Sequence, residues 1–312
     1  MHDGSVQESC KRLGMPLDDS KEEGPCEVLT FLGIEIDSIK GELRLPQDKV
    51  SQLRELLAKW GSKKHCRRRE LESLVGSLNH ACKVVRPGRA FKRRLQSRLA
   101  GVRRDGQRVR LNLDARADIE WWRQFGLNWN GTSLLSGWMT GEGDEIELVS
   151  DASGGWGCGA FWNGKWFQIK WDEVPGTAEW SIMPKELLPI VVAMVVWGKR
   201  WWKGTITARC DNMSVVAAVG AGNCKEKRSM HMLRCLAMVE ATLSLAVRVE
   251  HIRGVDNRVA DALSRNEAEF ARMLMQGAEM EPTAVPRELL EVLCKKGPSW
   301  CEPEWEKLLG LL

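Results

Sequence analysis

The sequence predicts an α/β protein in which a mixed five-stranded sheet with helices follows a mainly helical region. Residues 145–266 open with three short β-rich runs and then alternate strands with helices, as in a sheet of mixed direction. Residues 46–60 and 68–84 instead carry apolar side chains at helical spacing. A polar, glycine-rich stretch, residues 128–144, separates the two patterns. A chain of 312 residues is long enough for one large domain or two ordinary ones.

The first half is expected to be short strands followed by helices. Residues 1–27 are polar and turn-rich and predict a flexible segment. A strand is expected over 28–36, with a turn at Gly41 leading to a second strand that ends near Leu45. Pro46 then opens a helix. The expected helices cover 46–60, 68–84, 90–102 and 113–125, with a break at 86–89, and together with the strands they form a basic region, 28–127.

In the second half, strands are expected over 145–151, 157–162 and 165–171, the last two joined by a tight turn at Asn163 and Gly164. Further strands are expected over 205–211 and 245–252, with helices over 186–202, 214–219, 225–243 and 257–266 between and after them. Residues 267–312 are amphipathic and predict a helical C-terminal tail.

Positive charge is concentrated in one part of the chain. Between Lys63 and Arg110 there are 16 Lys or Arg residues and three acidic residues, although the formal net charge of the whole chain is only +4. Such a block usually meets a polyanion. A solvated helix face is the alternative interpretation of the same pattern.

Several classes of protein are disfavoured. The longest apolar run, Leu187 to Trp197, is too short to cross a bilayer, and no membrane association is expected. The N-terminus lacks the features of a signal peptide, and the ten cysteines contain no C-x-x-C pair. We therefore expect an intracellular protein, cytoplasmic or nuclear and not secreted. The spacing of His65, Cys66, His80 and Cys82 fits no familiar zinc pattern, and buried or helix-face positions are preferred for them.

Four acidic residues stand in distinctive local sequences. Asp151 and Asp211 each end a predicted strand, and carboxylates at the ends of neighbouring strands point into one crevice. Glu186 begins a predicted helix, and Asp261 lies on another. A purely structural interpretation is open for each residue alone: Glu186 can be a first-turn charge favoured by the helix dipole, and Asp211 a strand-end cap.

Together these segments resemble the ribonuclease H domain of reverse transcriptases, particularly those of DIRS-like and related retroelements. The most specific segment is His251-Ile-Arg-Gly-Val-Asp-Asn257-Arg-Val-Ala-Asp261, which carries the histidine, asparagine and final aspartate of that family at its spacing. Asp151-Ala-Ser-Gly-Gly-Trp-Gly157, Lys185-Glu186-Leu187 and Asp211-Asn212 resemble the other three acidic motifs. The resemblance covers residues 145–266. It implies a ribonuclease H-like fold for this part.

The resemblance continues upstream. Phe31-Leu-Gly-Ile-Glu-Ile-Asp37 followed by Leu45-Pro46 is similar to the passage from palm to thumb in those polymerases. Leu74-Val-Gly-Ser-Leu78 and Arg86-Pro-Gly-Arg-Ala-Phe91 are similar to thumb and connection helices. Residues 28–127 would accordingly be a thumb and connection region, followed by a linker over 128–144.

The resemblance implies a metal-dependent ribonuclease H that cleaves the RNA strand of an RNA–DNA hybrid with two Mg²⁺ ions, for which Mn²⁺ can substitute. Asp151, Glu186, Asp211 and Asp261 would hold the metals, and His251 would move a proton or assist product release. The basic block would grip the hybrid backbone. The residues expected to contact nucleic acid are Asn212, Asn257, Lys63, Lys64, Arg67, Arg68, Arg86, Arg89, Lys92, Arg93, Arg94 and Arg228.

Two departures from the family leave alternatives open. The sequence lacks a recognisable polymerase palm, so this chain alone is not expected to polymerise DNA. A catalytically inactive nucleic-acid-binding or scaffold remnant of a reverse transcriptase is the main alternative. A subunit that binds a separate polymerase chain is another, and the sequence indicates no oligomeric state.

Overall fold

A computed structural model describes residues 9–15, 26–102, 104–128, 146–202, 204–275, 277–294 and 302–312. Most of the expected N-terminal segment 1–27 and nearly all of the expected linker 128–144 therefore lie outside the described residues. Within the described ranges, no helix combines the length and the apolar character that a membrane crossing requires.

After a short helical turn at residues 9–12, the described chain forms a small antiparallel sheet of β1 (Val28–Phe31), β2 (Ile34–Asp37) and β3 (Glu42–Arg44), in that order. The single strand expected over 28–36 is wrong, because the chain reverses between Phe31 and Ile34. Leu32 and Gly33 both adopt positive φ, 50° and 73°, which suits a tight hairpin turn. Arg44 on β3 pairs with Glu35 and, at 3.0 Å, with Asp37 on β2.

The expected helical region follows this small sheet. It consists of α2 (Gln47–Trp60), α3 (Arg68–Ala81), a 3-10 turn η2 (Arg86–Phe91), α4 (Arg93–Ala100) and α5 (Leu113–Trp121), which runs into a π turn η3 (Trp122–Gly126). The apolar stripes predicted for the first two helices are buried. A two-stranded ribbon, β4 (His65–Arg67) and β5 (Arg108–Arg110), was not expected.

The second half contains the expected mixed five-stranded sheet. Its strands are β6 (Ile146–Ala152), β7 (Gly157–Trp162), β8 (Lys165–Lys170), β9 (Thr205–Cys210) and β10 (Ala246–His251). The order is β10-β9-β6-β7-β8, with β10, β9 and β6 parallel and β7 and β8 antiparallel. The predicted architecture, an α/β mixed five-stranded sheet with helices preceded by a mainly helical region, is confirmed.

Helices cover both faces of this sheet. Successive strand residues point to opposite faces, and on β8 Trp166 and Phe167 enter two separate apolar clusters. The cluster around Phe167 includes α7 (Ile182–Trp197) and α9 (Lys227–Leu243), and the one around Trp166 includes α10 (Arg258–Ser264) and α11 (Ala268–Leu274). The remaining elements are the helix α8 (Met213–Ala221) and the 3-10 turns Trp171–Glu173, Thr177–Glu179, Gly198–Trp201 and Gly254–Asp256.

The C-terminal tail is helical and packed. Beyond α11 it contains α12 (Arg287–Cys294) and α13 (Glu302–Leu311). Leu289, Leu293 and Leu308 are buried in the main core. Thr283 joins this segment to the sheet domain, because its amide donates to the Trp166 carbonyl at 2.7 Å and its hydroxyl accepts from the Trp197 indole at 3.1 Å.

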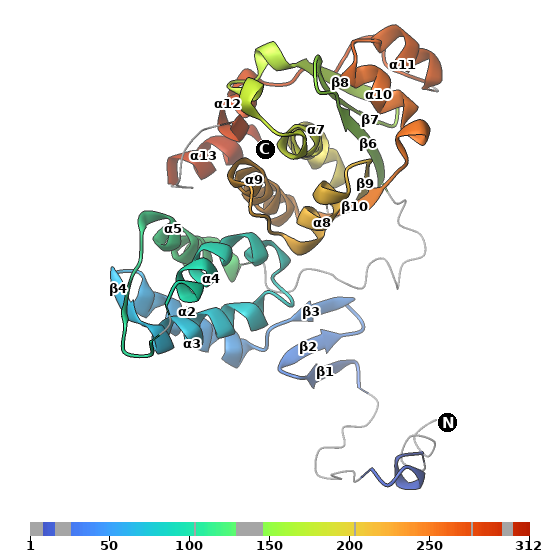
Figure 1. Ribbon diagram of the computed structural model, residues 1–312. Coiled ribbons are helices and arrows are strands. Elements are labelled where there is room, and N and C mark those ends of the chain that lie inside the picture. The colour runs from blue at the N-terminus through green and yellow to red at the C-terminus, as the bar shows by residue number, and fades with distance from the viewer. Residues whose placement is uncertain are drawn as a thin grey trace.

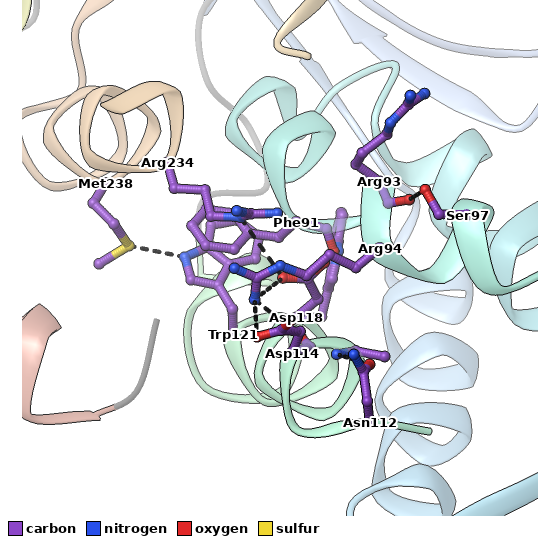
Figure 2. A network of polar contacts seen from close by, with 12 residues as sticks. Phe91, Arg93, Arg94, Ser97, Asn112, Asp114, Asp118, Trp121, Arg234 and Met238 are labelled. Atoms are coloured by element: carbon purple, nitrogen blue, oxygen red, sulfur yellow. Dashed lines mark hydrogen bonds and ion pairs between the residues drawn. The ribbon is translucent and has the colours of Figure 1, made fainter. Parts of the chain in front are cut away.

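A polar network joins α5 to α9, and Figure 1 places α9 between α7 and the helices of the first half. Asp118 on α5 is fully buried and lies 3.3 Å from Arg94 on α4 and 3.8 Å from Arg234 on α9 (Figure 2). Beside it the Trp121 indole donates to the Met238 sulfur at 2.8 Å. One continuous apolar core therefore spans both halves of the chain.

Candidate active site

Three parallel strands end side by side with polar residues. Val149 of β6 lies opposite Arg209 of β9, which puts Asp151 and Asp211, each two residues further on, at the same level. His251, the last residue of β10, lies opposite Cys210, the last residue of β9. The carboxyl edge of the sheet thus brings Asp151, Asp211 and His251 together, as expected for the crevice of an open α/β sheet.

Glu186 reaches this edge from α7. The helix begins at Ile182, four residues before the expected start, so Glu186 lies in its second turn and the first-turn interpretation does not apply. Its side chain is only 4% exposed. Ligand atoms of Glu186, Cys210 and Asp211 lie within 4.8 Å of one another, and the Cys210 thiol lies 3.9 Å from Oε2 of Glu186.

Asp151 is fixed by the opposite helix. It is 6% exposed, and the buried hydroxyl of Ser264 donates to its Oδ2 at 2.6 Å. Ser264 ends α10, the helix that carries Asp261. The Asp261 carboxylate is half-buried and accepts a hydrogen bond from Nε of Arg265 at 2.7 Å. This geometry sets Asp261 near the strand-end carboxylates, at the rim of the group.

The carboxylates act on one another electrostatically. Burial raises the pKa of Glu186 to about 9, and the nearby Asp151 and Asp211 add to the rise. Burial also raises the pKa of Asp151 to about 6, against the hydrogen bond from Ser264, and Asp211 and Asp261 raise it further. The charged carboxylates of Glu186 and Asp151 are therefore disfavoured unless a positive group lies beside them.

His251 and the turn after it border the same edge. His251 is exposed. A Cβ added to Gly254 in the 3-10 turn Gly254–Asp256 would lie 3.3 Å from Oδ2 of Asp211, which shows how closely this turn approaches the carboxylate. Asn212 begins α8, and its Oδ1 accepts from the amides of Ser214 and Val215 at 2.9 and 3.4 Å. Its carbonyl oxygen is thus engaged as a helix cap.

Asn257 is buried beside the end of β6. It is 3% exposed, and its Nδ2 donates to the carbonyl of Ser150, the residue before Asp151, at 2.9 Å. Its Oδ1 is buried without a hydrogen-bond partner among the described residues. In this position Asn257 ties the start of α10 to the end of β6.

The donor set suits a hard divalent cation. Carboxylate oxygens are the ligands that Mg²⁺ and Mn²⁺ prefer, and Glu186 and Asp211 offer such oxygens within one 4.8 Å group. Asp151, at the neighbouring strand end, acts electrostatically on both of them, but its oxygens are not part of that 4.8 Å group. A bound cation would offset the repulsion that raises the pKa of the buried carboxylates.

Sequence reasoning missed two residues of the site. Ser264 lies three residues after Asp261, a helical spacing that puts both on one face and was the available signal. Cys210 directly precedes Asp211, and no sequence pattern distinguished it from the other cysteines. The zinc alternative over His65, Cys66, His80 and Cys82 gains no support: among the described residues, the group with metal-binding geometry is Glu186, Cys210 and Asp211.

Several of the basic residues expected to hold nucleic acid are engaged within the protein. Arg68 pairs with Glu72 and Asp105, Lys63 pairs with Glu70 at 2.7 Å, and Arg94 faces the buried Asp118. Arg228 lies over the Trp180 ring and pairs with Glu179 at 3.3 Å. The Lys92 ammonium donates to Asn79, and Arg89 donates to the Gly220 carbonyl. Lys64 and Arg67 are exposed, and Arg86 and Arg93 are half-buried.

Comparison with known proteins found no matching family model and no matching curated protein. Among solved structures, the chain is similar to LC11-RNase H1 in complex with an RNA/DNA hybrid, with 17% identity over 41% of this chain and 99% of that one and a TM-score of 0.33. It is similar to RNase H1 from the halophilic archaeon Halobacterium salinarum NRC-1, with 14% identity over 40% and 98% of the two chains and a TM-score of 0.30. It is also similar to a foamy viral protease-reverse transcriptase in complex with double-stranded DNA, with 12% identity over 72% and 38% and a TM-score of 0.28.

Proposed function

We propose that this chain is a metal-dependent endonuclease that cleaves the RNA strand of RNA–DNA hybrids, and that it derives from the C-terminal part of a DIRS-like retroelement reverse transcriptase. The observation that carries the proposal is the convergence of Asp151, Glu186 and Asp211 at one edge of the sheet, with Asp261 on the adjacent helix. In this proposal residues 145–266 are the nuclease domain and residues 28–127 the thumb and connection region.

Asp151, Glu186, Asp211 and Asp261 would hold two Mg²⁺ ions, or Mn²⁺ in their place. When bound, such ions supply an activated water and stabilise the leaving oxygen of an in-line phosphodiester displacement. Asp151 interacts electrostatically with Glu186, Asp211 and Asp261, so it would be the member of the set that the other three share. Ser264 and Asn257 would keep the end of β6 in position through their hydrogen bonds to Asp151 and Ser150.

The remaining residues of the edge would handle the proton and the substrate. His251 is exposed at the end of β10, next to the turn that closely approaches Asp211, and an imidazole side chain can serve as a general acid or base. Asn212 would order the scissile strand with its amide NH₂, since its carbonyl oxygen caps α8. Selection of RNA would require contacts to 2′-hydroxyl groups. The cationic surface of the helical region would supply affinity that does not depend on sequence.

Cleavage of a labelled RNA–DNA hybrid by the purified chain, with Mg²⁺ or Mn²⁺ added or withheld, tests the proposal. We expect metal-dependent cutting of the RNA strand and little cutting of single-stranded RNA or duplex DNA. Asp211→Asn should abolish it. Asp172→Asn, which changes an exposed acid on the same domain, should retain it. Cleavage that persists undiminished in Asp211→Asn would contradict the proposed site. Cleavage that is absent at every metal concentration would favour an inactive nucleic-acid-binding remnant.

One surface supports the proposal of a separate polymerase chain as a partner. In the small sheet, Phe31 and Leu32 at the first turn and Ile39 at the second are 60%, 73% and 70% exposed. A cavity of about 530 Å³ lies beside them, between the first turn and the helices α2 and α3. Apolar surface of this kind suits a protein partner. Failure of Phe31→Ser/Leu32→Ser to weaken copurification with a polymerase fragment would count against this partner.

A further inference from the structure

The outer face of the β4–β5 ribbon carries a cluster of like charges. Cys66 and Val109, the central residues of the two strands, point inward and are buried. The outward residues are His65, Arg67, Arg108 and Arg110, all exposed. Arg67 lies directly opposite Arg108, and His65 opposite Arg110. Like charges directly opposite one another, as in Arg67 and Arg108, destabilise a strand pair.

Two hollows adjoin this ribbon. One measures about 840 Å³ and lies between the ribbon and the start of α5, and the other, of about 420 Å³, lies between the ribbon and α4. Arg98 of α4 and Arg110 of β5 line both, so the two hollows are neighbours, and we call the pair the ribbon groove. Besides Arg94, which faces Asp118, its basic lining residues are Lys64, Arg98, Arg108, Arg110 and Arg116.

Among the residues that the structure describes, these cations lack an acidic partner, in contrast to their neighbours. Arg68 and Arg69, close by in the chain, pair with Asp105, and Lys63 pairs with Glu70. Over the described parts of the chain, none of the five ribbon-groove cations forms an ion pair. The acidic residue that lines the groove, Asp114, lies 3.8 Å from Arg94. The groove therefore keeps a large positive excess in a concave surface, where the field on an approaching anion is strongest.

We propose that the ribbon groove binds the phosphodiester backbone of a nucleic-acid strand, at a site separate from the carboxylate edge. Arginine binds phosphate through a planar fork of donors, and a groove that runs past several arginines suits a repeating phosphate chain. The inference rests on the proposed function for the class of partner, but it requires no cleavage. The electrostatic contact then comes from four arginines of the groove, Arg98, Arg108, Arg110 and Arg116. Residues such as Arg94 and Arg68 contribute less, because they already face acidic residues of the protein.

Binding of a labelled RNA–DNA hybrid to the full chain, measured by fluorescence anisotropy in EDTA, tests the inference. The variant is Arg108→Gln/Arg110→Gln. The matched control is Arg54→Gln/Lys59→Gln, which removes the same charge from exposed positions on α2. Over about 50 to 200 mM KCl, the slope of log K against log salt should fall in magnitude by roughly 1.8 in the variant, about 0.9 for each lost phosphate contact. Affinity should fall about tenfold, and the control should match the wild type.

A second variant, Arg98→Gln/Arg116→Gln, changes the groove walls and leaves the ribbon intact. It should reduce the slope in the same way, and the melting temperatures of both variants should stay close to that of the wild type. The inference is overturned if neither variant changes the slope, or if the control changes it equally. It is also overturned if polyglutamate of equal charge competes as well as nucleic acid. Because the EDTA measurement needs no cleavage, failure of the proposed nuclease activity would be seen separately.

Discussion

The hydroxyl of Ser264 donates to Oδ2 of Asp151 at 2.6 Å and joins the end of α10 to the end of β6. Ser153 lies on the loop that follows β6, and its hydroxyl donates to the carbonyl of Ser264 at 2.7 Å. These two bonds fix the helix that carries Asp261 against the strand that carries Asp151. The relative position of two of the four carboxylates therefore depends on one buried serine.

Ser264→Ala should shift the pH dependence of cleavage. A hydrogen bond donated to a carboxylate favours its charged form, so its loss raises the pKa of Asp151 above about 6. The acidic limb of the pH–rate profile should move up by about one pH unit, with most of the activity recovered at higher pH. Ser264→Thr keeps the hydroxyl and should stay near the wild-type profile. An equal loss of kcat at every pH in Ser264→Ala would contradict this.

Glu186→Gln should stabilise the metal-free protein at alkaline pH while it abolishes cleavage. The pKa of Glu186, about 9, lies above the ordinary 4.5, so the folded state holds a proton that the unfolded state has lost. Stability from this group is complete below about pH 4.5 and is lost as the pH rises toward 9. The glutamine side chain of Glu186→Gln does not ionise, so the variant keeps this stability at high pH.

At pH 8 in EDTA, the free energy of unfolding of Glu186→Gln should exceed that of the wild type by roughly 1–3 kcal/mol. At pH 5 the two should be nearly equal. Glu173→Gln, an exposed change on the same domain, serves as the control. Added Mg²⁺ should raise the melting temperature of the wild type at pH 8 more than that of the variant. A Glu186→Gln protein that is less stable than the wild type at pH 8 would contradict this prediction.

The parts that could be predicted are those with a local signal. Asp151 and Asp211 end runs of β-forming residues, and parallel neighbours bring such ends together, so the carboxyl edge follows once the sheet is recognised. The Leu32–Gly33 turn was missed because the run from Val28 to Ile36 resembles one continuous strand, and the reversal also needs a positive φ at Leu32, a residue type that rarely adopts it.

Contacts between distant parts of the chain could not be predicted in the same way. The β4–β5 ribbon pairs His65 with Arg110 through strands of three residues, too short for any periodicity. Asp118 looks like an ordinary helix charge in the sequence. Asp118 can be buried because Arg94 of α4 and Arg234 of α9 lie beside it. This arrangement depends on the tertiary structure and has no local sequence signal.

Asn257→Ala should weaken cleavage through the position of Asp151. The amide of Asn257 holds the Ser150 carbonyl at 2.9 Å, one residue from the carboxylate, and loss of such a supporting contact typically costs 10–100-fold in metal affinity or activity. Mg²⁺ titration of the cleavage rate should give a higher half-saturating concentration. Asn79→Ala, an exposed change on α3, should leave it unchanged. An unaltered metal requirement in Asn257→Ala would show that Asn257 has no part in metal binding.

The buried contact between Asp118 and Arg234 should make the two halves of the chain unfold together. Asp118→Asn leaves the Arg234 guanidinium, only 3% exposed, without its counter-charge, and breaking a buried ion pair from one side costs about 3–5 kcal/mol. Arg123→Gln breaks an exposed pair with Glu120 on the same helical region and should cost less than about 1 kcal/mol. Chemical denaturation of both variants measures this.

Because the two residues share one interaction, Asp118→Asn/Arg234→Met should cost less than the sum of the two single changes. The Trp121 and Met238 contact beside them (Figure 2) leaves enough apolar surface for the double variant to keep the junction closed. In Asp118→Asn, the loss should appear as a second unfolding transition or a lower melting temperature for the helical half. Strict additivity of the single changes, or an Asp118→Asn cost no larger than that of Arg123→Gln, would mean that the ion pair does not couple the two halves.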